Sequence, residues 1–169
     1  MRWLHALTVT VLMAVSMTAA AELKVGVVDL RQALFTSDAA KSFSQKLQEN
    51  FKDDENKVRA AQDEAQKLKE RLEKDGAMMN EAERKKLAQQ FQEKAKEFSY
   101  LKNKLDSAVT SQKQDFLQQS RPMVDESLQE LLDSRELDLI LPREAVVYAK
   151  PSMDLTEELI KKLNAKSEQ

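Results

Sequence analysis

The 169-residue sequence is long enough for one ordinary domain, and 33% of its residues are charged. It contains no cysteine, which excludes disulfide bonds, thiolate nucleophiles and cysteine-ligated metals. The formal net charge of −2 and the pI of about 5.6, without a dominant basic stripe, argue against a nucleic-acid-binding surface.

The first 21 residues are typical of a secretory signal peptide. Arg2 supplies a positive start, residues 7–17 form an apolar stretch, and the alanines at positions 19, 20 and 21 provide a cleavage site that would leave Glu22 as the first mature residue. The apolar stretch is short for a membrane span. The alternative is a buried N-terminal helix of a cytosolic protein. We expect an exported, soluble product, cleaved after Ala21.

Removal of this segment would also limit the available chemistry. The only histidine and the only tryptophan, His5 and Trp3, lie in it, so the mature chain would have no imidazole, thiol or indole group. Carboxylates remain, but they are spread between lysines and arginines along helical segments, a pattern typical of solvated helix faces. We therefore expect no enzyme activity, no cofactor and no metal site.

A short strand and a helical turn are predicted at the mature N-terminus. Residues 23–30 are apolar and partly β-branched, and Gly26 indicates a close backbone approach or a bend. Residues 31–35 favour a helical turn. Thr36 or Ser37 is expected to cap the helix that follows, with Asp38 favourable in its first turn.

A long helical signal over residues 39–119 dominates the chain, and it breaks once, at Asp75–Gly76. Before the break, eight of ten positions spaced alternately by three and four are apolar: Ala40, Ser44, Leu47, Phe51, Asp54, Val58, Ala61, Ala65, Leu68 and Leu72. After the break, six of seven are apolar: Leu87, Phe91, Lys94, Phe98, Leu101, Leu105 and Ala108. Such narrow seams predict two coiled-coil helices, from Asp38 to about Lys74 and from near Glu81, that fold back as an antiparallel hairpin.

The two seams can be aligned across this hairpin. A turn between Gly76 and Met79 would pair Leu68 with Leu87, Ala65 with Phe91, Val58 with Phe98, Phe51 with Leu105, and Leu47 with Ala108. Small residues then meet large ones, which fills a two-helix seam. Asp54 would face Leu101, and the pattern does not explain it. The arm would be about 50 Å long, with so little core of its own that its base must be held by other elements.

The predicted tip covers residues 75–80. Gly76 suits a helix C-terminus and Asn80 the next N-cap. Met78 and Met79 would either offer an adaptable apolar surface to partners or fold over the hairpin end. Between residues 67 and 86 there are seven basic and five acidic residues, against seven and eleven from residue 121 onward. This mildly positive tip is either functional or merely scattered surface charge.

The second helix is expected to change partners near its end. Beyond Leu105 the apolar stripe shifts to Val109, Gln112 and Phe116, a stutter that turns the stripe to a new direction. Pro122 should kink or interrupt the helix. The residues after it form a broader apolar face that predicts packing on a body: Met123, Val124, Leu128, Leu131 and Leu132.

The tail switches to a strand pattern. Residues 137–141 and 145–149 are predicted strands, joined by a tight hairpin at residues 142–144. Residues 154–157 resemble a capping box, with Asp154 in place of Ser or Thr, at the start of a closing helix that runs to about Lys166.

The body built from these ends would be small and apolar. Three strands and a few short helices give little core, and apolar strand edges favour pairing with other copies of the chain. The pattern alone does not fix the number of copies. The residues expected in this oligomerisation body are Val25, Val27, Leu139, Leu141, Val146 and Tyr148.

This layout resembles the Skp (OmpH-like) family of periplasmic chaperones over essentially the whole mature chain. The similarity rests on the segment KVGVVDLRQALF at residues 24–35, and on LDLIL at 137–141, AVVY at 145–148 and DLTEELIKKL at 154–163. The coiled-coil middle matches only in length and order. The best-known members are strongly basic, whereas this chain is slightly acidic.

The resemblance implies an α+β, mostly α fold. A coiled-coil arm over residues 38–120 would project from a small β-rich body made of residues 22–37 and 121–169. It further implies a homotrimer with a shared β-barrel-like body, in which three arms surround a central cavity. The implied activity is that of a periplasmic holdase that keeps unfolded outer-membrane β-barrel proteins from aggregating without ATP.

The residues expected to contact clients lie near the tip: Met78, Met79, Lys67, Lys69, Arg71, Lys74, Arg84, Lys85 and Lys86. Weak contact with membrane lipids would depend on the cluster at residues 84–86. The alternative from another class is a structural coiled-coil spacer or adaptor in the cell envelope with one fixed partner. A spacer predicts one stoichiometric partner, whereas a holdase predicts many unfolded ones.

Overall fold

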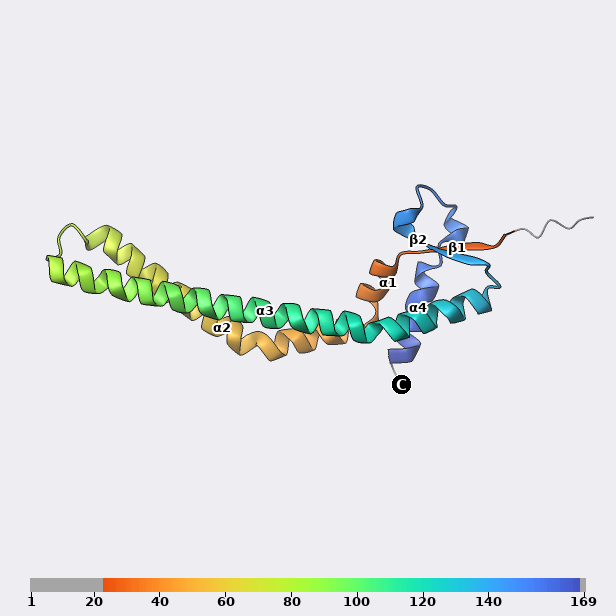
Figure 1. Cartoon of the computed structure of the whole chain (residues 1–169), viewed down its shortest axis with the longest axis horizontal. Helices are drawn as coiled ribbons and strands as arrows, with labels where there is room; N and C mark the ends of the chain where they lie inside the picture. Colours follow the sequence, from red (N-terminus) through yellow and green to blue (C-terminus); the bar gives the residue numbers. More distant parts are fainter. Residues whose placement is uncertain (1–22, 168–169) are drawn as a thin grey trace, which may run out of the picture.

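The computed structural model describes residues 23–167, and Figure 1 shows a long helical arm that projects from a small body. The elements, in chain order, are β1 (Val25–Val28), α1 (Leu30–Thr36), α2 (Asp38–Asp75), α3 (Glu81–Ser134), β2 (Leu139–Pro142), the 3-10 turns η1 (Arg143–Ala145) and η2 (Pro151–Met153), and α4 (Thr156–Ser167). The predicted signal peptide and Glu22 lie outside the described residues. The expected mostly helical fold with a long hairpin arm is confirmed.

The two arm helices begin at the caps that the sequence favours. The Ser37 side chain accepts a hydrogen bond from the Ala40 amide at the start of α2. At the start of α3, the Asn80 side chain accepts from the Glu83 amide, and the Glu83 carboxylate accepts from the Asn80 amide. This reciprocal capping box satisfies two amides that a helix start leaves unpaired. It therefore fixes the place where the hairpin turns back.

The buried stripe of the arm follows the predicted seam closely. Ala61 and Ala65 of α2 and Leu87 of α3 are buried, and the other apolar positions predicted along the arm are buried or half-buried. One position was wrong: Ser44 is exposed, and its neighbour Phe43 lies in the seam instead. Phe43 stacks on Phe116, with ring centroids 4.3 Å apart.

The observed pairs across the arm differ from the predicted alignment near the tip and near the base. Near the tip, the alignment would bring Gln92 opposite Glu64, yet the Lys94 ammonium lies 2.8 Å from a Glu64 carboxylate oxygen. Near the base, the same alignment would bring Lys113 opposite Phe43, yet Phe116 is the residue that stacks there. Both observed partners lie on the C-terminal side of the predicted one in α3, by two residues at Lys94 and by three at Phe116.

Pro122 does not interrupt α3, which continues to Ser134. Of the two expected effects, a kink or an interruption, the continuous helix excludes the interruption. Figure 1 shows that α3 changes direction as it enters the body. A proline removes one amide donor and crowds the preceding turn, which costs roughly 3 kcal/mol in a helix interior. The buried Leu131 beyond the proline packs in the body core and offsets this cost.

The core of the body joins both ends of the chain. Its buried members are Val28, Ala33, Leu131, Leu155, Leu159 and Leu163, from β1, α1, α3 and the α4 region. The Thr156 hydroxyl accepts a hydrogen bond from the Asp29 amide at 2.9 Å, which ties the start of α4 to the end of β1. Lys166 adds ion pairs to Glu126 (3.1 Å) and Glu130 (2.7 Å) of α3. The arm is therefore anchored by residues far apart in the sequence.

The sheet differs from the predicted one. β1 and β2 pair in parallel, with Val25 opposite Leu139 and Val27 opposite Leu141, and Val27 also bridges to Asp154 on its other side. Residues 145–149 form no strand, so the predicted 137–149 hairpin is wrong. A strand needs a partner edge. Residues 143–145 form the 3-10 turn η1 directly after β2, and the chain does not return along the outer edge of β2 as the hairpin requires.

We predict that Ser127→Ala will stabilise the body. Ser127 is fully buried in α3, and its hydroxyl has no hydrogen-bond partner among residues 23–167. The substitution removes an unsatisfied polar group and introduces a better helix former, together worth about 1 kcal/mol. In urea unfolding, the stabilisation would appear as a higher midpoint concentration with an unchanged dependence of the unfolding free energy on urea. The control is Ser134→Ala, because Ser134 is exposed and already donates to the Leu131 carbonyl. An unchanged or lower midpoint for Ser127→Ala would contradict the prediction.

Candidate functional site

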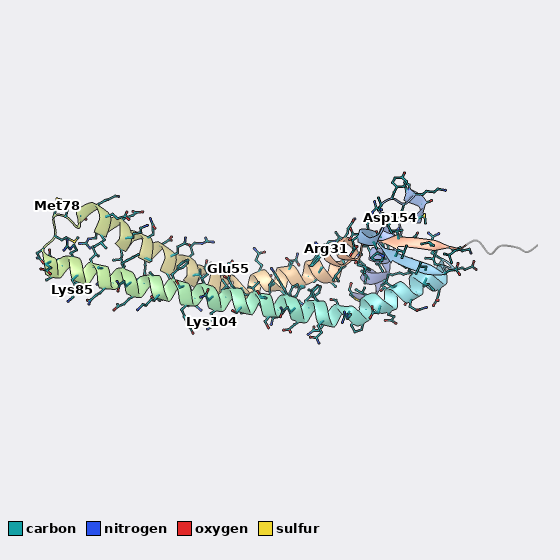
Figure 2. All side chains as sticks on the ribbon, turned by 45° about the horizontal axis from the view of Figure 1, so that its top comes forward. Arg31, Glu55, Met78, Lys85, Lys104 and Asp154 are labelled. Carbon is teal, nitrogen blue, oxygen red and sulfur yellow. The ribbon has the colours of Figure 1, made fainter. Side chains whose placement is uncertain are left out.

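The two methionines at the tip of the arm differ in exposure. The Met78 side chain is 81% exposed and lies at the free end with Lys85 (Figure 2). Met79 is half-buried and lines a groove of about 460 Å³ with Leu87. Of the two alternatives for this pair, folding over the hairpin end therefore describes Met79, and exposure describes Met78.

The seven predicted basic contact residues are all exposed on the two helices near the tip: Lys67, Lys69, Arg71, Lys74, Arg84, Lys85 and Lys86. The structure brings Arg71 and Lys86 from opposite helices into the groove that Met79 lines, whose floor is Leu87. Lys69 has a long ion pair to Glu73, at 3.8 Å. Exposed pairs of this kind contribute little. The other six make no ion pair within residues 23–167, so all seven cations can meet a partner.

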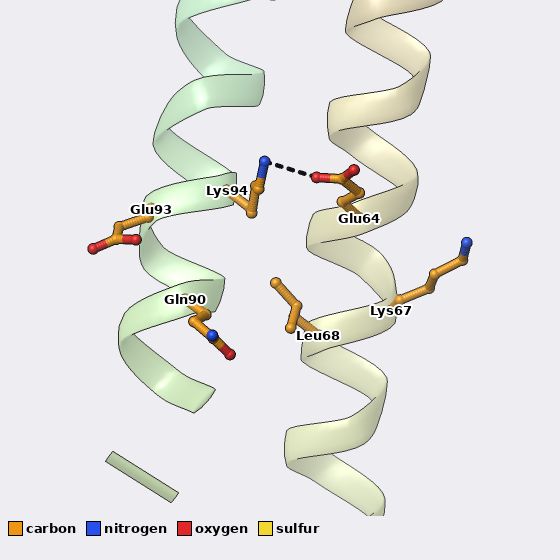
Figure 3. A pocket seen from close by; sticks show the side chains of 6 residues that line it. All are labelled: Glu64, Lys67, Leu68, Gln90, Glu93 and Lys94. Atoms are coloured by element: carbon orange, nitrogen blue, oxygen red, sulfur yellow. Dashed lines mark ion pairs between the residues drawn. The ribbon is translucent and has the colours of Figure 1, made fainter. Parts of the chain in front are cut away.

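A second groove of about 450 Å³ lies on the arm between α2 and α3, as Figure 3 shows. Its apolar element is Leu68, and Lys67 and Gln90 flank it on the two helices. Lys94 closes one end through its ion pairs with Glu64 at 2.8 Å and Glu97 at 2.9 Å. The groove therefore offers an apolar strip between charged walls.

Lys94 and Glu64 both stay charged near neutral pH. The hydrogen bond and the charge of Lys94 lower the pKa of Glu64, and its bonds to Glu64 and Glu97 raise the pKa of Lys94. Sequence analysis identified Lys94 as a polar seam position but missed Glu64. The available signal was an acidic residue on α2 at nearly the same height as Lys94.

Asp54, the unexplained polar seam position, is half-buried and paired. Its carboxylate lies 2.8 Å from the Lys57 ammonium, and the hydrogen bond and charge of Lys57 lower the pKa of Asp54, with a smaller contribution from Lys104 of α3. Asp54 and Leu101 line one groove between α2 and α3, so they lie close together, as the alignment predicted. A charge at this position is tolerated because it reaches cations at the edge of the seam.

The body presents a separate apolar surface. Exposed side chains include Leu23 (64%), Leu139 (41%), Val147 (102%) and Tyr148 (82%). Of these, Leu139 also lines a groove of about 440 Å³, together with Val28, Leu30, Leu128, Leu132, Ile140, Pro142, Gln129, Asp125 and Asp138. So large an apolar area on so small a body is typical of a surface that another chain covers.

The predicted oligomerisation residues do not all share this surface. Tyr148 and Leu139 are exposed, and Val25, Leu141 and Val146 are half-buried. Val27 is 1% exposed, so its side chain packs within its own chain and offers no surface to another copy. This follows from its central place, between β2 and the bridge to Asp154.

The described residues provide binding surfaces more readily than sites for chemistry. Among residues 23–167, no group of three or more histidine, cysteine or acidic side chains could hold a metal ion. In the same part of the chain, no helix is both long and apolar enough to cross a membrane. The distinctive features are instead the charged arm with its grooves and the apolar face of the body.

Known proteins match this chain over most of its length. Residues 24–163 match the profile of the family described as "Outer membrane protein (OmpH-like)". The "Skp-like protein" of Pseudomonas aeruginosa is 29% identical over 147 residues, covering 87% of this chain and 88% of that protein. "Chaperone protein Skp" of Vibrio cholerae is 24% identical over 138 residues, or 82% of each chain.

A solved structure shares the fold. The crystal structure of an OmpH-like protein from Caulobacter crescentus CB15 superposes with a TM-score of 0.64 and 18% identity, covering 86% of each chain. At this identity the likeness concerns the fold alone. The profile match provides the assignment: since it spans the strand at the start of the body, the whole arm and most of α4, this chain belongs to the OmpH-like family.

Proposed function

We propose that this chain is a periplasmic chaperone that holds unfolded outer-membrane β-barrel proteins without ATP and prevents their aggregation. The observation that carries the proposal is the long projecting arm with exposed cations and an exposed Met78 at its tip, in a family whose relatives include a chaperone. An unfolded barrel protein exposes alternating apolar residues and unpaired strand edges. Weak contacts spread along an arm suit a client that must later leave.

The proposed working form is a homotrimer in which the bodies associate and the arms surround a cavity. In this proposal residues 22–37 and 121–169 make the body and residues 38–120 the arm. The segment 143–150 carries the exposed Val147 and Tyr148 and two basic residues, Arg143 and Lys150, against one acidic residue, Glu144. The apolar groove of the body has Asp125 and Asp138 in its lining. Opposite charges would therefore meet if the segment of one copy lay in the groove of the next, a head-to-tail contact that can close into a ring.

The direct test is refolding by dilution. A urea-unfolded outer-membrane barrel protein is diluted into buffer with and without the mature chain, without nucleotide, and light scattering is followed. Suppression at about one trimer per client would support a holdase. Unaffected scattering at excess chaperone would contradict the proposal and favour a coiled-coil spacer with one folded partner.

The charges of the tip give a prediction about clients and membranes. Replacing all seven basic residues named above with Gln is expected to weaken client binding several-fold and to reduce its salt dependence, because screened attraction would be lost. The cluster at residues 84–86 would also account for any weak contact with anionic lipid. Binding titrations at low and at physiological salt measure the effect. Unchanged affinity and unchanged salt dependence would remove the electrostatic part of the proposal.

A matched control for this variant changes an equal number of exposed lysines and arginines outside the tip. The chain offers Lys41, Lys46, Lys52, Arg59, Lys96, Arg121 and Lys161, all exposed. If attraction depends on the tip, the control set will affect binding less than the tip set. An equal loss from both sets would show that only the total charge of the chain matters.

A further inference from the structure

The root of the arm holds an apolar groove that the tip and the body surface do not explain. It has a volume of about 380 Å³ and lies where α1, α2 and α3 meet. We call it the shoulder groove, and its larger lining residues are Phe35, Phe43, Leu47, Lys113, Phe116 and Leu117. Its volume falls in the range of clefts that take small ligands or single side chains, about 300–1,000 Å³.

Aromatic rings form much of this groove. Phe43 and Phe116 stack with a 13° angle between ring planes, which ties α2 to α3 at this level. Phe35, from α1, is 58% exposed, and Leu117 is 45% exposed. Both therefore leave apolar surface open beside a preformed aromatic pair. An aromatic side chain entering here would gain ring contacts in addition to apolar burial.

One charge defines the chemistry of the groove. Lys113 is the charged residue in its lining, and it makes no ion pair with any residue of the described range 23–167. Lys94, in the groove nearer the tip, is by contrast paired with Glu64. A single unmatched ammonium at an apolar groove favours a ligand that carries a carboxylate beside an apolar group.

We propose that the shoulder groove binds one aromatic side chain of an extended client segment, and that Lys113 binds a carboxylate two residues away in the same segment. In an extended chain, residues i and i+2 point to the same side, so both groups can reach the groove together. Transmembrane barrel strands carry aromatic girdles, so their unfolded chains supply such side chains. This inference depends on the proposed holdase function and adds a fixed anchoring site to it.

The test uses short fluorescein-labelled peptides and the mature chain. The probe has the core Phe-Ser-Asp in a Gly/Ser frame, and two comparison peptides have Phe-Ser-Lys and Ala-Ser-Asp. Fluorescence anisotropy is expected to give tightest binding for the first peptide. Lys113→Glu should weaken that peptide about two- to fivefold and strengthen the Phe-Ser-Lys peptide by a similar factor. This reversal is the critical observation, because general damage to the fold would weaken both peptides.

The apolar half of the groove is tested separately. The double variant Phe35→Ser/Leu117→Ser is expected to weaken the Phe-Ser-Asp peptide about tenfold. Tyr100→Ser is the matched control, because Tyr100 is also an exposed aromatic residue of α3 (65%) but lies outside the groove. Equal affinity for all three peptides, or equal loss in the control, would overturn the inference.

Light scattering of a full-length client, measured in parallel, separates the two proposals. Suppressed scattering without selective peptide binding would overturn the shoulder groove and leave the holdase proposal intact. Unsuppressed scattering would overturn both, because the groove would then have no client. A second copy of the chain is the other possible occupant of the groove, and sedimentation of the Phe35→Ser/Leu117→Ser variant tests it. A change in oligomeric state would show that a second copy fills the groove and would overturn the inference.

Discussion

Phe98→Asp is expected to separate the two helices in the middle of the arm and to lower the thermal stability of the chain. Phe98 is half-buried in the seam of α3, on the stripe that faces α2. The substitution removes a large ring from this seam and introduces a charge that would have to be desolvated. Because the ring is only half-buried, we expect the free energy of unfolding to fall by about 3 kcal/mol, the lower end of the range for replacing a buried aromatic residue. Circular dichroism at 222 nm would show reduced helicity and an earlier melting transition.

Two further variants make this result specific. Phe98→Ala removes the ring without adding a charge and should have a smaller effect. Tyr100→Asp places the same charge two residues away on a side chain that is 65% exposed, so it should change stability by no more than about 0.5 kcal/mol. If Phe98→Asp and Tyr100→Asp melt alike, Phe98 does not hold the arm together and the proposed alignment is wrong.

The arm was predictable because its information is local. Apolar positions spaced alternately by three and four residues specify a buried stripe on one helix. The caps Ser37 and Asn80 each accept a hydrogen bond from an amide only three residues further along the chain. The wrong prediction of Ser44 in place of Phe43 as a seam residue shows the limit of this local pattern. The regular spacing favours Ser44, but stacking on Phe116 needs an aromatic residue, and that partner lies on the other helix.

The sheet was predicted less well because a strand is defined by its partner. Residues 145–149 have the composition of a strand, and the sequence pattern assigns them to a hairpin with residues 137–141. In the structure β2 instead lies parallel to β1, and the 145–149 segment pairs with no strand of the described residues 23–167. No local pattern distinguishes these alternatives.

The candidate site was predictable in composition but not in arrangement. The excess of basic residues between residues 67 and 86 is visible in the sequence. That Arg71 and Lys86 share a groove with Met79 depends on how α2 and α3 are aligned at the tip, to within a turn of helix. The pairing of Lys94 with Glu64 depends on the same alignment. The shoulder groove forms only where three helices meet, so no local sequence pattern indicates it.

The double variant Val147→Asp/Tyr148→Asp is expected to convert the proposed trimer into single chains and to abolish the suppression of client aggregation. Val147 and Tyr148 are 102% and 82% exposed, so the substitution should leave the fold of each chain unchanged. Fully burying either side chain at an interface is worth about 1.5–3 kcal/mol, and buried unpaired carboxylates would add a further cost. Association should therefore weaken by at least about 100-fold.

Sedimentation equilibrium measures the mass of the assembly, and circular dichroism verifies that the helical content is kept. Tyr100→Asp is again the control, because it adds an acid at an exposed tyrosine of the arm and should leave the assembly intact. Single chains that still suppress scattering would show that one arm suffices and that no cavity is needed. A variant that keeps its assembly would show that segment 143–150 does not join the bodies. Loss of both assembly and suppression would instead show that the proposed client binding by the arms requires association through segment 143–150, which pairs with no strand of residues 23–167.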